Sequence, residues 1–250
     1  MSNVVAEYAY TDREGQFIAK KLRWEPGFDG GRSKDFTWRR PMPNWPEGTP
    51  QPWVNGLNAG LYYPQANANG PPVYKPTADS TVQGAIELEA CRVGLYRIHD
   101  LLSAKMEMPI FVVEGEGKAD LLKGLGFVAV SGPAGKSKWD VLWGSDFQDR
   151  RIVVIPDRDV ATDGGMVWGN QVAASALYFN AASVRIVELP ISELKPESQG
   201  GDIKDWILRK LERKPSAPTA ARRGWVVEIV KASHEYSRLP IAQAADKAAA

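Results

Sequence analysis

The sequence contains one cysteine, Cys91, and only two histidines among its 250 residues. A single cysteine excludes an intramolecular disulfide and a zinc site built from cysteine ligands. The sequence also lacks a signal-peptide pattern and any apolar run of the roughly 18 residues that a membrane-spanning helix requires. We therefore expect a cytoplasmic protein that has no membrane partner.

The chain also has almost no excess of one charge, because 31 basic residues oppose 30 acidic ones and leave a net charge of +1. This balance argues against a protein that coats nucleic acid over its whole surface, although it permits a local basic groove. Hydrophobic residues make up 44% of the chain, which is enough to bury a core. The length allows one large domain or two small ones.

The first 108 residues have the composition of a β-rich region. Residues 4–10 and 16–24 are rich in strand-forming residues and flank "TDREG", which predicts a hairpin, and a third strand is expected over 35–39. Residues 41–76 are dense in Pro, Gly, Asn and Trp and predict a long surface loop. A helix is expected over part of 85–104.

Beyond Pro109 the pattern changes to continuous apolar runs rather than alternating ones. Such runs are typical of strands that are covered on both faces, and therefore of a parallel sheet. Helical segments are expected between them, over 117–125, 138–148 and 165–181. The runs are "IFVVE" (110–114), "GFVAVS" (126–131), "RIVVIP" (151–156) and "SVRIVEL" (183–189).

This alternation predicts an α/β fold, a doubly wound and mainly parallel sheet preceded by a small β-rich α+β subdomain. The expected divisions are residues 1–108 for the β-rich subdomain with its long Pro/Gly loop and 109–212 for the doubly wound domain. The last expected division, 213–250, is a linker, a C-terminal helix and a disordered alanine-rich tail.

Acidic residues follow two of the predicted strands directly. Glu114 follows the first, and Asp157 and Asp159 follow the third. Ligands of a doubly wound sheet bind beyond the carboxyl ends of its strands, and residues two apart in an extended segment point the same way. Like-charged carboxylates held together cost stability unless a cation or a proton offsets them. Hard oxygen ligands of this kind suit Mg²⁺ or Mn²⁺.

Two further acids, Asp202 and Asp205, stand in "GGDIKDW" at the expected start of a helix. They are additional candidates for metal ligands. A cap on the helix N-terminus explains the same pair equally well. Both interpretations stay open from the sequence.

The stretch "SGPAGKSKW" (131–139) superficially matches the loop that binds ATP phosphates. That loop requires a glycine five residues before its final Gly-Lys pair, and this position is Val130. Gly132 is followed by Pro133, which has no N–H to donate to a phosphate. The sequence therefore argues against an ATPase P-loop.

Taken in order, these motifs resemble the Toprim domain of bacterial, phage and plasmid primases. The signature of that domain is a Glu-Gly after the first strand and Asp-x-Asp after the third, which match Glu114-Gly115 and Asp157-Arg158-Asp159. "FVVEGEGKADLLKGLGFVAVSGPAGKSKW" is similar to the Toprim domains of phage and plasmid primases, whose glycine-rich loop ends in Lys-Trp. "EYAYTDREGQFIAKKLRW" and "LYRI" (95–98) are similar to the subdomain that precedes it. The resemblance covers about residues 6 to 212.

The resemblance implies a DNA primase, a nucleotidyltransferase that makes short primers on single-stranded DNA from nucleoside triphosphates with Mg²⁺ or Mn²⁺. Glu114, Asp157 and Asp159 would be its catalytic residues. Asp157 and Asp159 would bind metal, and Glu114 would be either a third ligand or the general base. A separately encoded replicative helicase is a candidate partner. The residues expected to bind nucleotide or phosphate are Lys34, Arg92, Lys136 and Lys138.

A basic and aromatic segment, residues 13–40, is the candidate template-binding surface, because phosphate contacts and base stacking hold single strands. Its expected DNA-binding residues are Arg23, Arg39, Arg40 and Trp38, although a solvated hairpin face with a few core aromatics fits the same pattern.

The chain departs from the family at Lys118, which stands where a further acid is usual, with Asp120 two residues on. The zinc ribbon and the helicase domain of many primases are not found in these residues. A Toprim nuclease, or a non-catalytic module that binds single-stranded nucleic acid, therefore remain alternatives.

Overall fold

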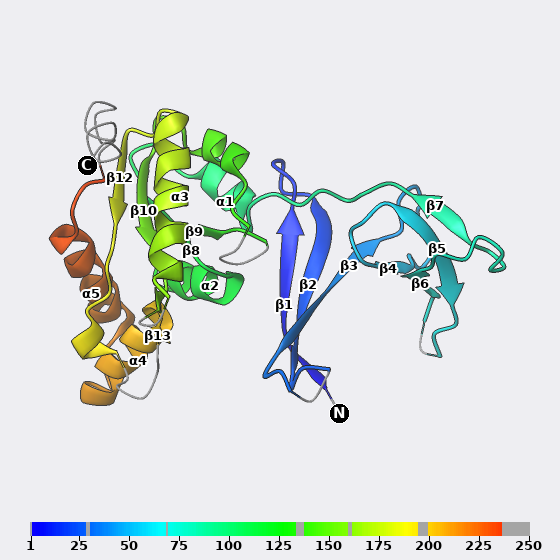
Figure 1. Ribbon diagram of the computed structural model, residues 1–250, viewed down its shortest axis with the longest axis horizontal. Helices are drawn as coiled ribbons and strands as arrows, with labels where there is room; N and C mark the ends of the chain where they lie inside the picture. The colour runs from blue at the N-terminus through cyan, green and yellow to red at the C-terminus, as the bar shows by residue number, and fades with distance from the viewer. Residues whose placement is uncertain are drawn as a thin grey trace, which may run out of the picture. The chain divides into compact units, whose positions relative to one another are not determined.

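The computed structural model describes residues 2–28, 31–68, 70–133, 138–159, 162–194 and 200–236. The chain divides into two units, residues 1–94 and residues 95–250, and each is described by itself. The first unit is built on a β-rich sheet and the second on a parallel sheet with helices, so the protein is a mixed α/β protein (Figure 1).

The first unit begins with the predicted hairpin, in which β1 pairs antiparallel with β2. The turn between them is fixed by Asp12, whose carboxylate accepts hydrogen bonds from the backbone N–H groups of Glu14 (3.1 Å) and Gln16 (2.7 Å). Gly15 closes the turn with a φ of 88°, a conformation that glycine adopts without strain. The predicted third strand is also present and pairs with β2. The three strands are β1 (Asn3–Thr11), β2 (Phe17–Glu25) and β3 (Asp35–Pro41).

The prediction of one long loop over 41–76 was wrong. This region contributes three short strands, and a fourth follows, so that the sheet has seven strands in the order β1-β2-β3-β4-β6-β5-β7. Met42, Val54, Tyr62 and Leu88 form a small core beneath them. Strands of three to six residues that contain or adjoin proline show too little alternation to be recognised in the sequence. The added strands are β4 (Trp53–Asn55), β5 (Gly60–Gln65), β6 (Val73–Pro76) and β7 (Ile86–Leu88).

The second unit contains the four strands that the apolar runs predicted. They form one parallel sheet in the order β12-β10-β8-β9. All four residues of β8 are buried, as expected for a strand that is covered on both faces. The strands are β8 (Ile110–Val113), β9 (Val128–Ser131), β10 (Arg151–Ile155) and β12 (Ser183–Ile186).

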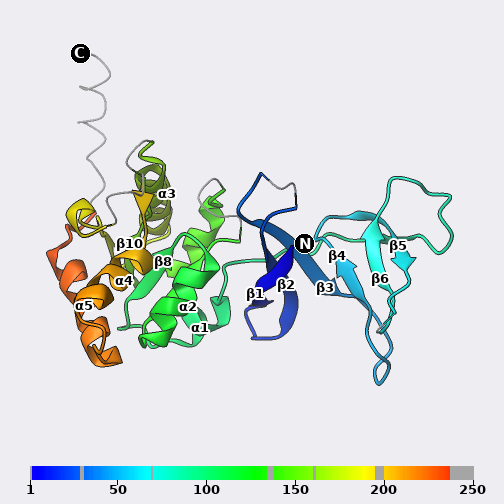
Figure 2. The ribbon, with the colours of Figure 1, turned by 90° about the horizontal axis from the view of Figure 1, so that it is seen from below.

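Helices cover both faces of this sheet. Figures 1 and 2 show α3 on one face and α2 on the other. A 3₁₀ helix, η2 (Val141–Phe147), lies where a helical segment was expected over 138–148. No helix within the described ranges is long and apolar enough to cross a membrane. The α-helices are α1 (Ile98–Ser103), α2 (Glu116–Gly124), α3 (Gly164–Tyr178), α4 (Ile203–Arg213) and α5 (Thr219–Ala232).

Residues 95–108, which the sequence analysis placed with the first domain, group with the second unit. The reason is packing, because Leu95, Ile98 and Leu101 belong to the same buried cluster as Ile110 and other residues of the parallel sheet. The expected C-terminal helix is present as α5, whereas the expected tail from residue 237 onward lies outside the described residues.

The strand order reverses between β8 and β10. From β8 the chain passes through α2 to β9 on one side, whereas β10 and β12 lie on the other side. In open parallel sheets the crevice beyond the carboxyl ends of the strands at such a reversal is the usual place for a ligand. The residues that follow β8 and β10 are therefore the first place to look for a site.

The start of α3 lies directly against the end of β10, and this contact generates a stability prediction. A Cβ atom added at Gly165 would lie 1.9 Å from the carbonyl oxygen of Asp157. We expect Gly165→Ala to lower the free energy of unfolding by about 1–3 kcal/mol, because backbone would have to move. Chemical denaturation with urea measures this loss.

Gly224→Ala is the matched control, because a Cβ at Gly224 in α5 meets no heavy atom within 4 Å. In a helix this change should raise the free energy of unfolding by up to about 1 kcal/mol. A Gly165→Ala variant as stable as the unmodified protein would contradict the close approach of α3 to Asp157.

Candidate functional site

Glu114 and Asp157 lie together at the strand reversal. Val113 pairs with Ile155 in the last step of the β8–β10 ladder, so the residues that follow the two strands emerge side by side. The Oε1 atom of Glu114 accepts a hydrogen bond from the backbone N–H of Asp157 at 3.0 Å. Glu114 is only 7% exposed, so this bond holds a largely buried carboxylate at the sheet edge.

The turn after Glu114 places a basic side chain in front of these acids. Gly115 has a φ of 106° and precedes the first residue of α2, which lets the chain leave the strand and begin the helix at once. Lys118, in the first turn of α2, forms an ion pair with the Oδ1 atom of Asp157. Its Nζ atom also lies 3.5 Å from the Oδ2 atom of Asp202.

A short antiparallel ladder brings Asp202 to this place. Strand β11 (Arg158–Asp159) pairs with β13 (Gly200–Gly201), so that Arg158 lies opposite Gly201. Asp202 follows at once and starts α4. Segments that are more than 40 residues apart in the sequence therefore meet beside Lys118.

Asp202 and Asp205 form a reciprocal cap on α4. The Oδ1 atom of Asp202 accepts the backbone N–H groups of Lys204 (2.8 Å) and Asp205 (3.0 Å). The Oδ2 atom of Asp205 accepts the backbone N–H of Asp202 at 3.2 Å. The sequence left open whether this pair caps a helix or binds metal. In the structure Asp205 is part of the helix cap. Asp202 both caps the helix and contacts Lys118.

The chemistry of Glu114 and Asp157 fits a hard divalent cation, because Mg²⁺ is commonly bound by one or two carboxylates together with water and substrate phosphates. In the part of the chain that the structure describes, no group of three or more His, Cys, Asp or Glu side chains could hold a metal ion. The side chain of Asp159 is outside the described side chains. A cation here would therefore be completed by water or phosphate.

Trp139, the last residue of the glycine-rich stretch, packs against two other tryptophans. The ring of Trp139 lies 5.2 Å from that of Trp143 and 6.0 Å from that of Trp168, measured between centroids. Lys138, the residue before Trp139, is exposed, whereas Lys136 lies outside the described residues. The chain continues from Val141 as a 3₁₀ helix, not as the α-helix that a P-loop requires.

A second polar network, which sequence reasoning did not identify, surrounds Asp120 of α2. Its Oδ1 atom accepts hydrogen bonds from the hydroxyl of Tyr96 at 2.9 Å and from Nε and Nη2 of Arg97 at 2.8 and 2.6 Å. The backbone N–H of Tyr96 donates to the carbonyl of Ser131 at 2.8 Å. The "LYRI" motif therefore ties α1 to α2 and to the end of β9. The only signal in the sequence was the motif itself.

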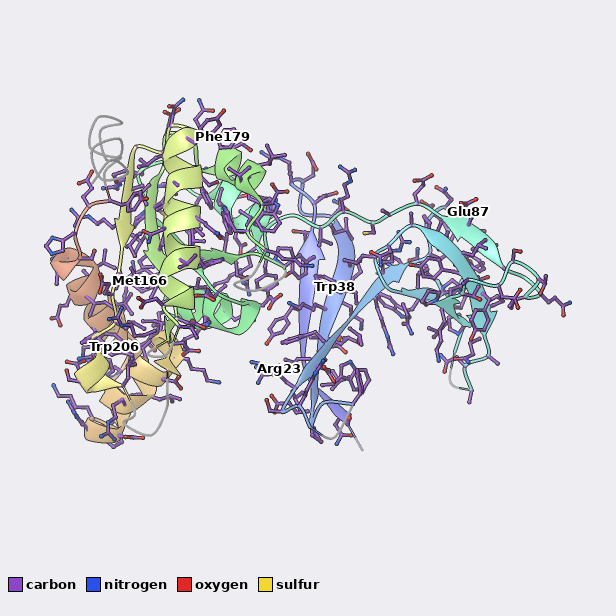
Figure 3. The ribbon with its side chains drawn as sticks, in the orientation of Figure 1. Arg23, Trp38, Glu87, Met166, Phe179 and Trp206 are labelled. Carbon is purple, nitrogen blue, oxygen red and sulfur yellow. The ribbon has the colours of Figure 1, made fainter. Side chains whose placement is uncertain are left out.

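Two candidate DNA-binding residues of the first unit share a face of its sheet. In the β2–β3 ladder Lys21 lies opposite Trp38, and Arg23 lies opposite Phe36. Side chains two apart in a strand share a face, so Arg23 and Trp38 lie on one face of this ladder (Figure 3). The Nζ atom of Lys21 lies 4.6 Å from the ring centroid of Phe36. This face thus combines cations with aromatic rings.

The remaining basic candidates are distributed differently. Arg39, the neighbour of Trp38 in β3, points to the opposite face and pairs with Lys20. Lys34 and Arg92 are exposed residues outside the strands of the same unit.

The environment of Arg40 does not fit the prediction that this residue binds DNA. It is 5% exposed, and its guanidinium donates hydrogen bonds to the carbonyls of Glu89 (2.7 Å) and Asn58 (3.4 Å). A buried guanidinium with backbone partners cannot reach a phosphate without breaking the unit that surrounds it. The structure therefore gives Arg40 a role in packing.

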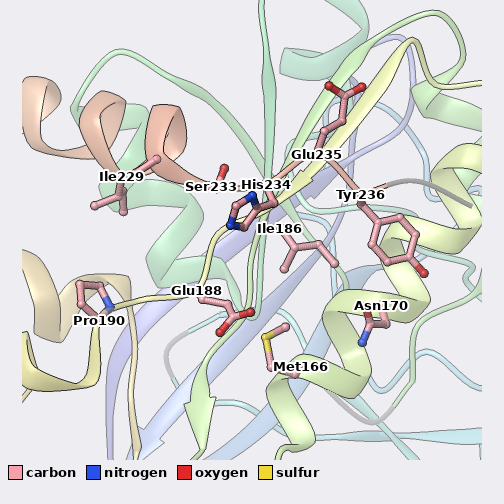
Figure 4. Close-up of a pocket in the computed structure, with 11 residues that line it drawn as sticks. Met166, Asn170, Ile186, Glu188, Pro190, Ile229, Ser233, His234, Glu235 and Tyr236 are labelled. Atoms are coloured by element: carbon pink, nitrogen blue, oxygen red, sulfur yellow. The ribbon is translucent and has the colours of Figure 1, made fainter. Parts of the chain in front are cut away.

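A cavity of about 540 Å³ lies elsewhere in the second unit, between α3, the segment that follows β12 and the end of α5 (Figure 4). Met166, Ile186, Glu188 and His234 are among its lining residues, whereas Glu114, Asp157 and Lys118 are not. Arg158, which follows Asp157, forms an ion pair at 3.5 Å with Glu188 of this lining.

Comparison with known proteins finds distant similarity to solved structures. No family model and no curated protein sequence matches the chain. A similar solved chain belongs to the structure of the bacteriophage T7 lagging-strand DNA polymerase interacting with primase domains of two gp4 subunits, bound to an RNA/DNA hybrid and dTTP. The match covers 92% of this chain and 78% of that chain, with 12% identity and a TM-score of 0.41. At these values the two chains are only distantly similar.

The Asp120 network generates a prediction about alkaline stability. Burial, and next the negative charge of Asp120, raise the pKa of the Tyr96 hydroxyl above its ordinary value of about 10. A raised pKa contributes stability below pH ~10, and this contribution is lost as the pH rises toward the folded-state value. We expect the unmodified protein to lose stability relative to a Tyr96→Phe variant between pH ~9.5 and ~11.

Urea unfolding of both proteins across this pH range is the measurement. Near pH 7 the Tyr96→Phe variant should be about 1 kcal/mol less stable, because it lacks the hydrogen bond to Asp120. Tyr178→Phe, which changes an exposed tyrosine, controls for the general loss of a phenol. The prediction would be contradicted if the two proteins differed in free energy of unfolding by the same amount at every pH in this range.

Proposed function

We propose that this chain is a primase-type nucleotidyltransferase of the phage or plasmid kind, which synthesises short primers on single-stranded DNA. The observation that carries the proposal is the position of Glu114 and Asp157 at the strand reversal of a parallel sheet, joined through the Asp157 N–H. Their spacing in the sequence is the Toprim-like pattern described above. The match between this pattern and this edge of the sheet favours phosphoryl chemistry over a purely structural use of the acids.

The catalytic residues in this proposal are Glu114, Asp157 and Asp159, with Asp157 and Asp159 as metal ligands. A bound Mg²⁺ or Mn²⁺ would make the attacking 3′-hydroxyl more acidic and neutralise the charge that develops on the phosphates. Glu114 acts either as a further ligand or as the general base. Its hydrogen bond to the Asp157 N–H fixes the direction of its carboxylate in both roles.

Substrate contacts are assigned to basic residues around the two units. Lys136 and Lys138 of the glycine-rich loop, with Lys34 and Arg92, are proposed to contact the triphosphate or the primer. Arg23 and Trp38, on one face of the β2–β3 ladder, and Arg39, on the opposite face, are proposed to contact the single-stranded template through phosphates and stacking. We further propose a cytoplasmic location and a separately encoded replicative helicase as partner.

A direct assay separates this function from its alternatives. Pure protein is incubated with single-stranded DNA, labelled nucleoside triphosphates and Mg²⁺ or Mn²⁺, and the products are separated by size. New short oligomers support the primase. Shortening of the template would indicate a nuclease, and binding without any product would indicate a non-catalytic module.

Asp157→Asn tests the catalytic assignment. We expect primer synthesis to fall by roughly 100-fold or more, because the variant loses a charged ligand that is needed mainly at the transition state. Binding of single-stranded DNA at low salt should remain nearly unchanged or become slightly tighter, since a negative charge is removed. Product formation and fluorescence anisotropy measure the two effects on the same preparation.

Asp149→Asn is the control for this variant. Asp149 is exposed and has a φ of 58°, a conformation that asparagine adopts readily, so both activities should be retained. Full primer synthesis by the Asp157→Asn variant would exclude Asp157 from the chemistry.

Arg39→Ala tests the template surface. Each lost phosphate contact lowers the slope of log affinity against log salt by about 0.7 for single strands. We expect this variant to bind single-stranded DNA more weakly and with a slope that is smaller by about that amount. Anisotropy across a salt series measures both quantities.

Two other variants serve as comparisons for Arg39→Ala. Arg209→Ala removes a cation that is paired with Glu212 in α4, and it should leave the slope unchanged. Arg40→Ala should instead lower the stability of the first unit, because it removes the hydrogen bonds of a buried guanidinium to the backbone carbonyls of Glu89 and Asn58. An unchanged slope for Arg39→Ala would remove Arg39 from the template surface.

A further inference from the structure

Lys118 is the one basic side chain that contacts two acids of the candidate site within the described residues. Its side chain is 12% exposed, and its ammonium group lies against Asp157 and within 3.5 Å of Asp202. The two carboxylates come from different segments, one after β10 and the other at the start of α4. The Lys118 ammonium therefore interacts electrostatically with both segments.

A lysine at position 118 does not stabilise α2 itself. Lys118 lies in the first turn of the helix, where the helix dipole disfavours a positive charge. Glu116, in the same turn, has the sign that the dipole favours. The favourable interactions of Lys118 must therefore come from the acids beyond the helix.

The charge balance of the site points the same way. Glu114, Asp157 and Asp202 bring three carboxyl groups to one sheet edge, and ionised carboxylates held close together repel one another unless a cation or a proton offsets them. The ammonium of Lys118 supplies part of that offset in the protein alone. A divalent cation bound through the Oδ1 atom of Asp157 would compete with the ammonium group for that oxygen.

We propose that Lys118 is a built-in counter-cation that competes with the divalent metal for Asp157, so that the protein without substrate binds metal weakly. This inference rests on the proposed function, because it assumes that Asp157 is a metal ligand. Metal entry requires the Lys118 ammonium to leave Asp157. Lys118 is thus a positioning residue, which acts through Asp157 and not on the reacting atoms.

The test is metal binding by the full chain in the absence of DNA and nucleotide. Isothermal titration with MnCl₂ and with MgCl₂ compares the unmodified protein with Lys118→Met. If Lys118 competes with the metal, the variant should bind Mn²⁺ between about 5-fold and 150-fold more tightly, the usual range for coupling between two binding events. Addition of metal should also raise its melting temperature by more than that of the unmodified protein.

Lys123→Met is the matched control. Lys123 lies on the same helix and forms its ion pair with Asp100, at 2.7 Å. Asp100 is not one of the acids of the candidate site. The metal affinity of Lys123→Met should equal that of the unmodified protein. Lys118→Gln, which also removes the charge but keeps a polar group beside Asp157, serves if Lys118→Met does not fold, as judged by circular dichroism.

The outcomes separate this inference from the proposed function. Equal or weaker metal binding by the Lys118 variants, with clear binding by the unmodified protein, would overturn the inference alone. If neither the unmodified protein nor the Lys118 variants bind metal without nucleotide, the inference fails, and the primer-synthesis assay with Mg²⁺ or Mn²⁺ decides the proposed function separately. Tighter binding by the Lys118 variants, in a protein that makes no primers with its metal, would support the inference and refute the primase.

Discussion

The parallel pairing of β8 with β10 is the constraint on which the rest of the candidate site depends. It sets Val113 beside Ile155, and Glu114, the residue after β8, then accepts a hydrogen bond from the backbone N–H of Asp157. Because the strand order reverses at this pair, the crevice beyond the ends of the two strands is the expected place for a ligand. Every other group of the site is added to this edge, Lys118 from the first turn of α2 and Asp202 through the β11–β13 ladder.

Glycines let these pieces approach so closely. Gly115 allows the chain to turn from β8 into α2 at once, which is why Lys118 reaches back to Asp157. Gly165 allows the start of α3 to lie against the carbonyl of Asp157, where any side chain would collide. The same edge therefore has a helix start on each side, and helix starts favour negative groups such as carboxylates and phosphates.

Basic residues that are neighbours in the sequence of the first unit have different environments in the structure. Arg39 and Arg40 are neighbours in the sequence, yet one is half-buried on the sheet and the other is a buried donor to backbone carbonyls. Alternation along a strand explains the split, because successive side chains point to opposite faces. A basic cluster counted along the sequence is thus no measure of a basic surface.

The sequence by itself determined the parallel sheet, the hairpin and the order of the acids along the chain, because continuous apolar runs and a turn of the "TDREG" type depend on local chemistry. The short strands between residues 41 and 76 were not predicted, because they are short and contain or adjoin proline, which obscures the alternation of apolar and polar residues. Only the tertiary structure decided that Asp205 caps a helix, that Asp120 receives Tyr96 and Arg97, and that Lys118 faces Asp157. These contacts join segments through pairing and packing, and a side chain's partner depends on which segment packs beside it.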